Sequence, residues 1–302
     1  MEDFLYRNNR PTIIRAQGED AEDYLQSQWS IDLRRMEEGD VRFGLRLSLK
    51  GKVLAGAYLI RLEEEEFLLI AENIPSGALL EMLEENVVAD EVEFFDESEK
   101  WAFFSLKITK PDALLAKLGN AKLLDAGFSH LKDGLFFAND RLSDDGYCAL
   151  VKKGSFAIDE ICKELPEISE SEYGFQRIKG RNYSIPHEVG SDDLPQEAGL
   201  EKNSVDFDKG CYLGQEVMAR LHAMGKVQRE IIPIRLENEK QPHPALPVTV
   251  MFENKAVGQL RSLIRHKDMW VGVAKIHLKA KEQLSESGLN LEEEEWGKIF
   301  SL

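Results

Sequence analysis

Apolar and polar positions alternate along the first quarter of the chain in short runs. Four runs have the length and composition of strands, at residues 12–15, 42–49, 53–62 and 67–70. A turn at 50–52 and a charged turn at 63–66 connect the last three. Residues 18–20 precede apolar positions with helical spacing, and acidic residues there suit the positive end of a helix. The pattern predicts an antiparallel meander with one helix.

The same pattern then recurs more loosely. A helix is expected to begin at 75–77, and the next predicted elements are strand 92–95, strand 101–108, helix 111–118 and strands 122–125, 135–138 and 147–151. No Gly-rich loop follows a strand as a dinucleotide-binding fold requires. The order therefore favours an α+β layered architecture over a doubly wound sheet.

The last part of the chain has a different character. A helix is predicted at 170–180 and a loop at 182–194, and short strands follow at 231–236, 247–252, 256–265 and 269–276. These strands predict a small C-terminal β-barrel or sandwich. Residues 290–296 are expected to be a solvated acidic tail. We expect three domains, 1–100, 101–228 and 229–302, with the first two free to interleave.

Composition narrows the classes of function. The chain has 302 residues, 43% of them hydrophobic, and a net charge of -17, which disfavours direct binding of nucleic acid. Basic residues between 209 and 235 form either a patch for an anionic ligand or ordinary solvated charges. No apolar run reaches membrane-spanning length and no signal peptide is apparent, so we expect a cytoplasmic protein without a membrane partner.

The three cysteines, Cys148, Cys162 and Cys211, are few and far apart. Their odd number and spacing indicate free thiols in a reducing compartment. The spacing contains no paired-cysteine motif, so no intrinsic metal site is predicted.

The segment KGCYLGQE at 209–216 is the strongest candidate for chemistry. Its two glycines allow a close approach of the backbone to a ligand, and an amphipathic helix is expected to begin at Gln215, with Arg220 one turn after Glu216. A helix N-terminus and Lys209 beside Cys211 favour the thiolate form of that cysteine. The alternative is a packed turn with a buried, inert cysteine.

These residues also carry a resemblance. KGCYLGQE matches the KGCYxGQE signature of the YgfZ family, position by position. LPQEAGL at 194–200 resembles the P-x-E-A-x-L segment of that family and of the glycine cleavage T-proteins. LQSQ at 25–28, followed by Asp32, and KGK at 50–52 resemble further family motifs, so the resemblance covers essentially the whole chain.

The resemblance implies a T-protein-like ring of three domains around a central channel that binds tetrahydrofolate or another folate derivative. The YgfZ family is linked to the assembly or repair of iron–sulfur proteins and through them to tRNA thiolation, and the signature cysteine is needed for that role. Folate and iron–sulfur client or assembly proteins are therefore the expected partners. The implied functional thiol is Cys211, and the implied ligand-binding residues are Lys209, Gly210, Tyr212, Gly214, Gln215, Glu216, Arg220, Glu197, Arg177 and Gln28.

Two departures from the T-protein pattern bear on activity. T-proteins carry an acidic pair where this chain has Ala55 and Gly56, so no aminomethyltransferase activity is expected. In the T-protein pattern R-x-E-x-G, Lys179 and Arg181 stand in place of the acid and the glycine. Another acid such as Glu197 would then face the pterin, while the two cations either hold the glutamate tail of folate or end a solvated helix.

The sequence leaves open other functions for the chain and other roles for some single residues. Besides the accessory role, a folate-dependent one-carbon transferase and a folate-free scaffold are possible. Asp192 and Asp193 either pair with cations or, as we expect, lie in a surface turn. His222 either tunes Cys211 or, as we expect, lies on the surface of the helix that follows the signature.

Overall fold

The structure is a computed structural model that describes residues 3–118, 127–139, 141–142, 145–238, 245–292 and 296–302. Among these residues, the strands of the first sheet and its two helices are β2 (Thr12–Gln17), α1 (Ala21–Gln28), β3 (Val41–Leu47), β4 (Val53–Glu63), β5 (Glu66–Ala71), α2 (Ser76–Glu84) and β6 (Glu93–Asp96). The second sheet and its helices are β1 (Phe4–Asn8), β7 (Trp101–Lys107), α3 (Pro111–Lys117), β8 (Phe128–Leu131), β9 (Gly134–Ala138), β10 (Gly146–Lys152) and α4 (Phe156–Glu164).

The rest of the chain runs back across the first sheet and ends in a barrel. Its main elements are α5 (Glu170–Lys179), α6 (Glu201–Ser204), α7 (Gln215–Met224), β11 (Arg229–Glu237), β12 (Val248–Phe252), β13 (Lys255–His266), β14 (Met269–His277), α8 (Lys281–Glu286), β15 (Leu289–Leu291) and β16 (Lys298–Ser301). Short 3-10 helices lie at Leu33–Arg35, Ser98–Lys100, Pro195–Glu197 and Leu278–Ala280.

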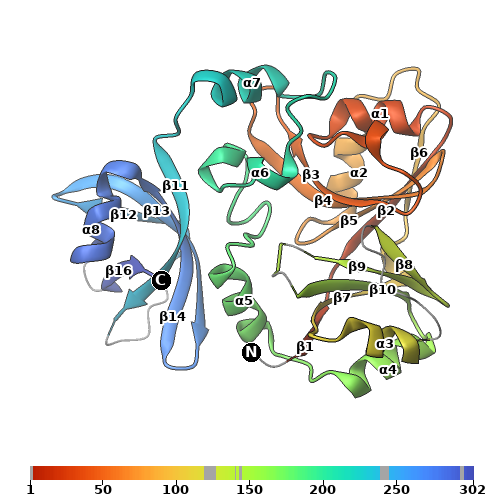
Figure 1. Cartoon of the computed structure of the whole chain (residues 1–302). Helices are drawn as coiled ribbons and strands as arrows, with labels where there is room; N and C mark the ends of the chain where they lie inside the picture. The colour runs from red at the N-terminus through yellow and green to blue at the C-terminus, as the bar shows by residue number, and fades with distance from the viewer. Residues whose placement is uncertain (1–2, 119–126, 140, 143–144, 239–244, 293–295) are drawn as a thin grey trace.

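The two sheets pack face to face, and a pair of helices covers the outer face of each (Figure 1). Strand β4 shows why this arrangement forms. Alternate side chains point to opposite faces of a strand, so Ala57 and Leu59 pack under α1 and α2 while Tyr58 and Ile60 meet the second sheet. A strand buried on both faces needs apolar residues at nearly every position, as in the run 53–60.

The sheets are not consecutive in sequence. Strand β1 pairs with β7 in the second sheet, whereas β2 lies between β5 and β6 in the first. Strands β11, β14, β13, β12, β15 and β16 close a barrel, seen on the left of Figure 1. A further apolar cluster joins barrel residues such as Ile231 and Val271 to Leu45 and Val53 of the first sheet. Helix α5 and the segment after it therefore lie between the two sheets and the barrel.

The predicted strands and helices of the first sheet, and the four predicted barrel strands, are confirmed. The sequence interpretation missed β1, β8, β16, α4, α6 and α8, and all of these except α4 have six residues or fewer. The expected acidic tail is wrong in its first part, because residues 289–291 form β15, which pairs with β12 and β16 to close the barrel. The predicted strand 122–125 lies outside the described residues.

Candidate functional site

A polar pocket lies where the first sheet meets α5 and the segment that follows it. Its enclosed volume is about 20 Å³. Its lining consists of Phe43, Gly56, Tyr58, Ile70, Glu72, Asn73, Arg141, Arg177, Asn182, Tyr183, Ser184 and Ile185. Aromatic walls surround charged groups there, as is common in sites for small planar ligands.

Glu72 is the acidic residue among these lining residues, and it stands directly after β5. Its side chain is partly accessible to solvent, yet burial by the surrounding protein raises its pKa. Nearby Arg141 and Arg177 oppose that increase, as does a hydrogen bond of 3.3 Å from Asn8 Nδ2 to Glu72 Oε2. A carboxylate in this position can still accept further hydrogen bonds.

The two arginines of the pocket have other contacts. The Arg141 guanidinium stacks on the Phe43 ring at 3.7 Å and donates to the carbonyl of Tyr183 at 3.1 Å. Arg177 forms a two-point ion pair with Glu188, at 2.5 and 2.9 Å. Burial opposes ionisation of Glu188, but the ion pair outweighs it and lowers the pKa of the carboxyl.

A buried charge cluster extends from this ion pair to the barrel. Ser262 Oγ donates to Glu188 at 2.6 Å, and Arg261 and Lys275 both bind Asp193. Glu197 accepts from Lys275 at 2.8 Å and from the backbone of Leu194 at 2.9 Å. This cluster therefore joins strands β13 and β14 to the segment after α5.

The expected surface turn at Asp192 and Asp193 is wrong for the second residue. Asp193 is fully buried, whereas Asp192 is exposed. Burial opposes ionisation of Asp193, but hydrogen bonds from Arg261, Lys275 and the Gly190 N–H outweigh it and lower the pKa. The turn lies against the barrel, so its inner carboxylate is an internal counter-ion.

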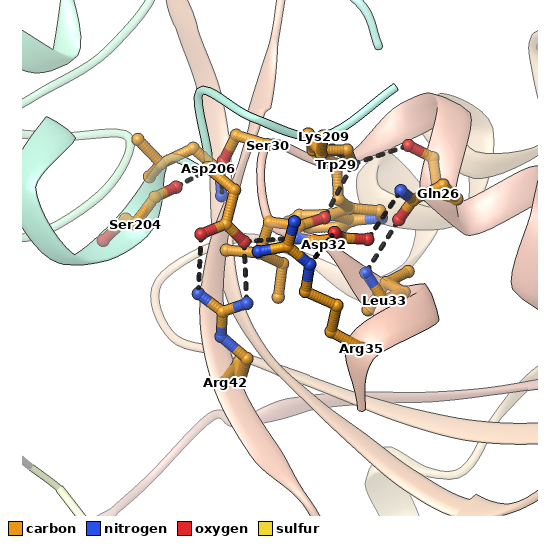
Figure 2. Close-up of polar contacts among 12 residues, drawn as sticks. Gln26, Trp29, Ser30, Asp32, Leu33, Arg35, Arg42, Ser204, Asp206 and Lys209 are labelled. Carbon is orange, nitrogen blue, oxygen red and sulfur yellow. Dashed lines mark hydrogen bonds and ion pairs between the residues drawn. The ribbon is translucent and has the colours of Figure 1, made fainter. Parts of the chain in front are cut away.

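The signature segment 209–216 begins at a buried lysine (Figure 2). Lys209 Nζ donates to the carbonyls of Gln26, Trp29 and Ile31 at 2.8, 2.6 and 2.6 Å. The Gln26 carbonyl lies in the last turn of α1, and those of Trp29 and Ile31 follow the helix, where backbone acceptors lack helical partners. Burial lowers the pKa of Lys209 to about 8, with Asp32 opposing the decrease.

Further contacts hold the residues on either side of this lysine. Asp206 binds Arg42 through two hydrogen bonds, at 2.7 and 3.1 Å, and accepts from the backbone N–H of Asp32 at 2.5 Å. Figure 2 shows this ion pair beside the lysine. After the turn, Leu213 N–H donates to the carbonyl of Ser27 at 3.2 Å. The turn is thus attached to the first sheet's domain on both sides of its tip.

The tip itself is open to solvent. Gly210 and Cys211 are exposed, and a Cβ added at Gly210 would meet nothing within 4 Å. Cys148 is buried and Cys162 partly buried. The alternative of a buried, inert signature cysteine is therefore wrong with respect to burial, while the reactivity of Cys211 stays a prediction.

Among the candidate ligand-binding residues, Arg177 lines the pocket. The structure brings most of the others together in a different place, around the start of α7. Gly214 caps that helix with φ +80°, Gln215 donates to the carbonyl of Lys209, and Glu216 pairs with Arg220 in solvent. Tyr212 is buried.

The remaining candidate residues have other surroundings. Gln28 is buried and accepts from Asn86. Glu197 is bound by Lys275, as described above, and is absent from the pocket lining. His222 is exposed as predicted, with its ring stacked on Phe207 at 3.9 Å.

The positions that depart from the T-protein pattern are now located. Gly56 lines the pocket, and a Cβ there would lie 2.6 Å from Phe43 Cζ and 2.9 Å from Ile185 Cδ1. Lys179 is exposed at the end of α5, and Arg181 pairs with Glu230 at 3.3 Å. Sequence reasoning missed Glu72, although its position directly after an apolar strand was an available signal.

Within the described part of the chain, no group of three or more histidine, cysteine or acidic side chains is arranged to hold a metal ion. The helices of that same part include none with the length and apolar character needed to cross a membrane.

The sequence of the chain is similar to those of several known proteins. The GCVT N-terminal domain family matches residues 12–136. An iron-sulfur cluster assembly factor IBA57 homolog from Coccidioides immitis is 32% identical over 38% of this chain and 27% of its own length. The tRNA-modifying protein YgfZ of Colwellia psychrerythraea is 26% identical over 79% of this chain and 74% of its own.

A solved structure has the same overall fold. The aminomethyltransferase T of the glycine cleavage system from Bartonella henselae superposes with a TM-score of 0.79, over 98% of this chain and 83% of that one, at 17% identity. At that identity the likeness concerns the fold alone. The expected T-protein-like α+β fold with a C-terminal β-barrel is confirmed.

Proposed function

Since the chain belongs to the YgfZ family and has the T-protein fold, we propose that it is a folate-binding accessory protein for the assembly or repair of iron–sulfur proteins. Through such clients it would support tRNA modification indirectly. The names of two relatives, an iron-sulfur cluster assembly factor and a tRNA-modifying protein, agree with both parts of this role. The free cysteines fit a reducing compartment, and we propose that the protein acts in the cytoplasm.

The exposure of Cys211 carries the proposal. A thiol at the tip of a turn, held on both sides by Lys209 and Leu213, is accessible to a partner protein without unfolding of the chain. Such a thiol is available for exchange or ligation chemistry. The resemblance to the YgfZ family supports the assignment of Cys211 as the functional cysteine.

The pocket residues fit a pterin ring in their chemistry. A pterin is a planar ring with an amidine-like edge of N–H donors, which a carboxylate such as Glu72 matches, and Phe43, Tyr58 and Tyr183 supply aromatic walls. The enclosed volume of about 20 Å³ admits about one water. Ring binding therefore requires a lining side chain to move, and the long side chain of Arg141, stacked on Phe43, is a suitable one.

The second candidate function is a folate-dependent one-carbon transferase. In T-proteins an aspartate on this strand drives aminomethyl transfer, and Gly56 occupies the pocket-lining position here. An added Cβ would already contact Phe43 and Ile185, so a carboxylate has no room without rearrangement. This crowding favours the accessory role.

Two measurements test the proposal. Calorimetric titration with 5-formyltetrahydrofolate, a stable folate, should give binding at micromolar concentrations. In a strain that lacks its own YgfZ-type protein, the wild-type chain should restore the activity of an iron–sulfur enzyme, and C211A should not. C162A is the matched control, because Cys162 is only partly buried and lies outside the signature.

Equal restoration by C211A and C162A would remove the thiol from the mechanism. Absence of folate binding by the folded wild-type protein would favour a scaffold that has only the fold. Formation of methylene-tetrahydrofolate from an aminomethylated carrier protein would establish the transferase instead.

A further inference from the structure

We propose that Glu72 selects the ligand of the pocket, by accepting hydrogen bonds from the amidine edge of a planar nitrogen heterocycle. This inference rests on the proposed folate-binding function and assigns the recognition step to one residue. The sequence patterns discussed above do not include Glu72, and the acid expected from those patterns was Glu197.

Position is the first argument. Glu72 follows β5 directly, next to the strand that carries Gly56 and Tyr58, and its side chain is partly accessible among the residues that line the pocket. The two other acid positions considered are unsuitable, because residue 179 is an exposed lysine and Glu197 is bound by Lys275. Glu72 is the carboxylate among the described lining residues.

Unused hydrogen-bonding capacity is the second argument. A carboxylate offers about four acceptor positions, and the structure gives Glu72 a hydrogen bond from Asn8 at 3.3 Å. Arg177 and Arg141 are near enough to influence its charge. Their hydrogen bonds go to Glu188, Asn182 and Tyr183 instead. The arginines thus favour the ionised carboxylate without occupying its acceptor positions.

The surrounding walls supply the third argument. The rings of Phe43 and Tyr58 meet edge to face at 5.2 Å, and Tyr183 lies on the same pocket. Aromatic faces favour flat ligands. A flat ring whose edge presents two neighbouring N–H donors satisfies both the walls and the carboxylate. The ligand class is therefore an amidine-edged heterocycle such as a pterin.

The test compares two ligands on two proteins. E72Q preserves the shape of the side chain but replaces one acceptor oxygen by a donor. We expect about 10–100-fold weaker binding of 5-formyltetrahydrofolate by E72Q. The 2-desamino analogue of the same folate lacks one of the edge donors, and its affinity should change less than about twofold between wild type and E72Q. E85Q, which alters an exposed acid after α2, is the matched control and should bind like wild type.

Each outcome decides the assignment. Equal weakening of both ligands by E72Q, or no weakening of either, would make Glu72 a counter-ion of the arginines and overturn the inference while folate binding stands. Failure of the folded wild type to bind 5-formyltetrahydrofolate would overturn the folate proposal and this inference with it. Thermal melts of each variant identify any loss of affinity that results from unfolding.

Discussion

Lys209 and Trp29 lie 180 residues apart in the sequence, and the lysine Nζ donates to the Trp29 carbonyl at 2.6 Å. Two more carbonyls, of Gln26 and Ile31, accept from the same ammonium group. The signature segment therefore starts at a buried point of attachment and not on the ligand pocket. In this protein the first signature residue positions the turn, and the third residue, Cys211, is exposed to solvent.

Removing the ammonium group should loosen this attachment. We expect K209M to lower the free energy of unfolding by about 1–3 kcal/mol, because buried carbonyl oxygens lose their donor. The pKa of Lys209 is lowered to about 8, below its ordinary 10.5, so the unfolded chain binds this proton more tightly than the folded chain. Wild-type stability gains from this group as pH rises from about 8 to 10.5, and the difference between wild type and K209M should widen.

Denaturant unfolding at pH 7.5 and pH 9.5 checks this prediction. K226M is the matched control, since Lys226 is exposed just after α7, and it should change stability by less than about 0.5 kcal/mol. A K209M protein as stable as K226M at both pH values would show that the ammonium group contributes no net attachment.

Two neighbouring aspartates provide a second test, of the charge cluster that joins the barrel to the segment after α5. D193N removes the partner of Arg261 and Lys275 inside the protein, and we expect it to cost about 3–5 kcal/mol. D192N alters an exposed carboxylate and should be close to neutral. The pKa of Asp193 is lowered below its ordinary 3.8, so its stabilisation is present above that pH and is lost as pH falls through the folded-state value.

Guanidinium unfolding of both variants at pH 7 and pH 3 measures these effects. The gap between wild type and D193N should shrink at the lower pH, since below 3.8 the unfolded chain takes up a proton that the folded chain binds more weakly. Equal stability of D193N and D192N at pH 7 would mean that Arg261 and Lys275 find other partners.

Most strands and helices could be predicted from the sequence because the burial of their faces leaves a regular pattern of apolar and polar residues. Strand β4 is apolar at nearly every position because it is buried on both faces, and α1 has an acidic first turn. Strands β1 and β15 were not readable in this way. Each is short, and each depends on partners far along the chain, β1 on β7 and β15 on β12.

The site could be predicted only in part, because several of its contacts also join residues that are far apart in the sequence. The signature identified Cys211, but it did not indicate that Lys209 and Gln215 serve the turn itself. Asp193 is a turn residue by local preference and is buried because Arg261 of β13 lies opposite. The role of Glu72 depends on Arg141 and Arg177, which come from other elements, so a one-dimensional pattern carries little information about it.

The crowding at Gly56 leads to a third prediction. G56A should lower the free energy of unfolding by about 1–3 kcal/mol, because its Cβ would lie 2.6 Å from Phe43 Cζ and 2.9 Å from Ile185 Cδ1. G77A is the matched control. Gly77 lies in α2 with nothing within 4 Å of an added Cβ, so alanine there should be neutral or stabilising by about 0.5–1 kcal/mol. A G56A protein as stable as G77A would show that the pocket adapts easily and would reopen the space for a carboxylate.

The last prediction concerns the cost of an ionised acid in the pocket. Burial raises the pKa of Glu72 above its ordinary 4.5, so between that value and the raised one the folded chain binds more protons than the unfolded chain. Stability falls as pH rises through this window. Because this stability is lost as pH rises above 4.5, Glu72 is a net cost to the fold at pH 7, and neutral E72Q should melt about 1–3 °C above wild type. At pH 4, where the wild-type carboxyl is largely protonated, the difference should vanish.

The groups around Glu72 do not complicate the interpretation of these melting temperatures. Besides Arg141 and Arg177, the titratable groups that interact with Glu72 are Tyr6, Tyr58, Tyr173 and Cys148. Their pKa values are all raised, so these four groups are neutral below pH 8. Thermal melts of both proteins at pH 4 and pH 7 supply the measurement. A lower melting temperature for E72Q at pH 7 would identify Glu72 as a stabilising partner of the arginines. A higher one would mean that the fold retains a carboxylate at the expense of stability, as expected of a residue kept for binding.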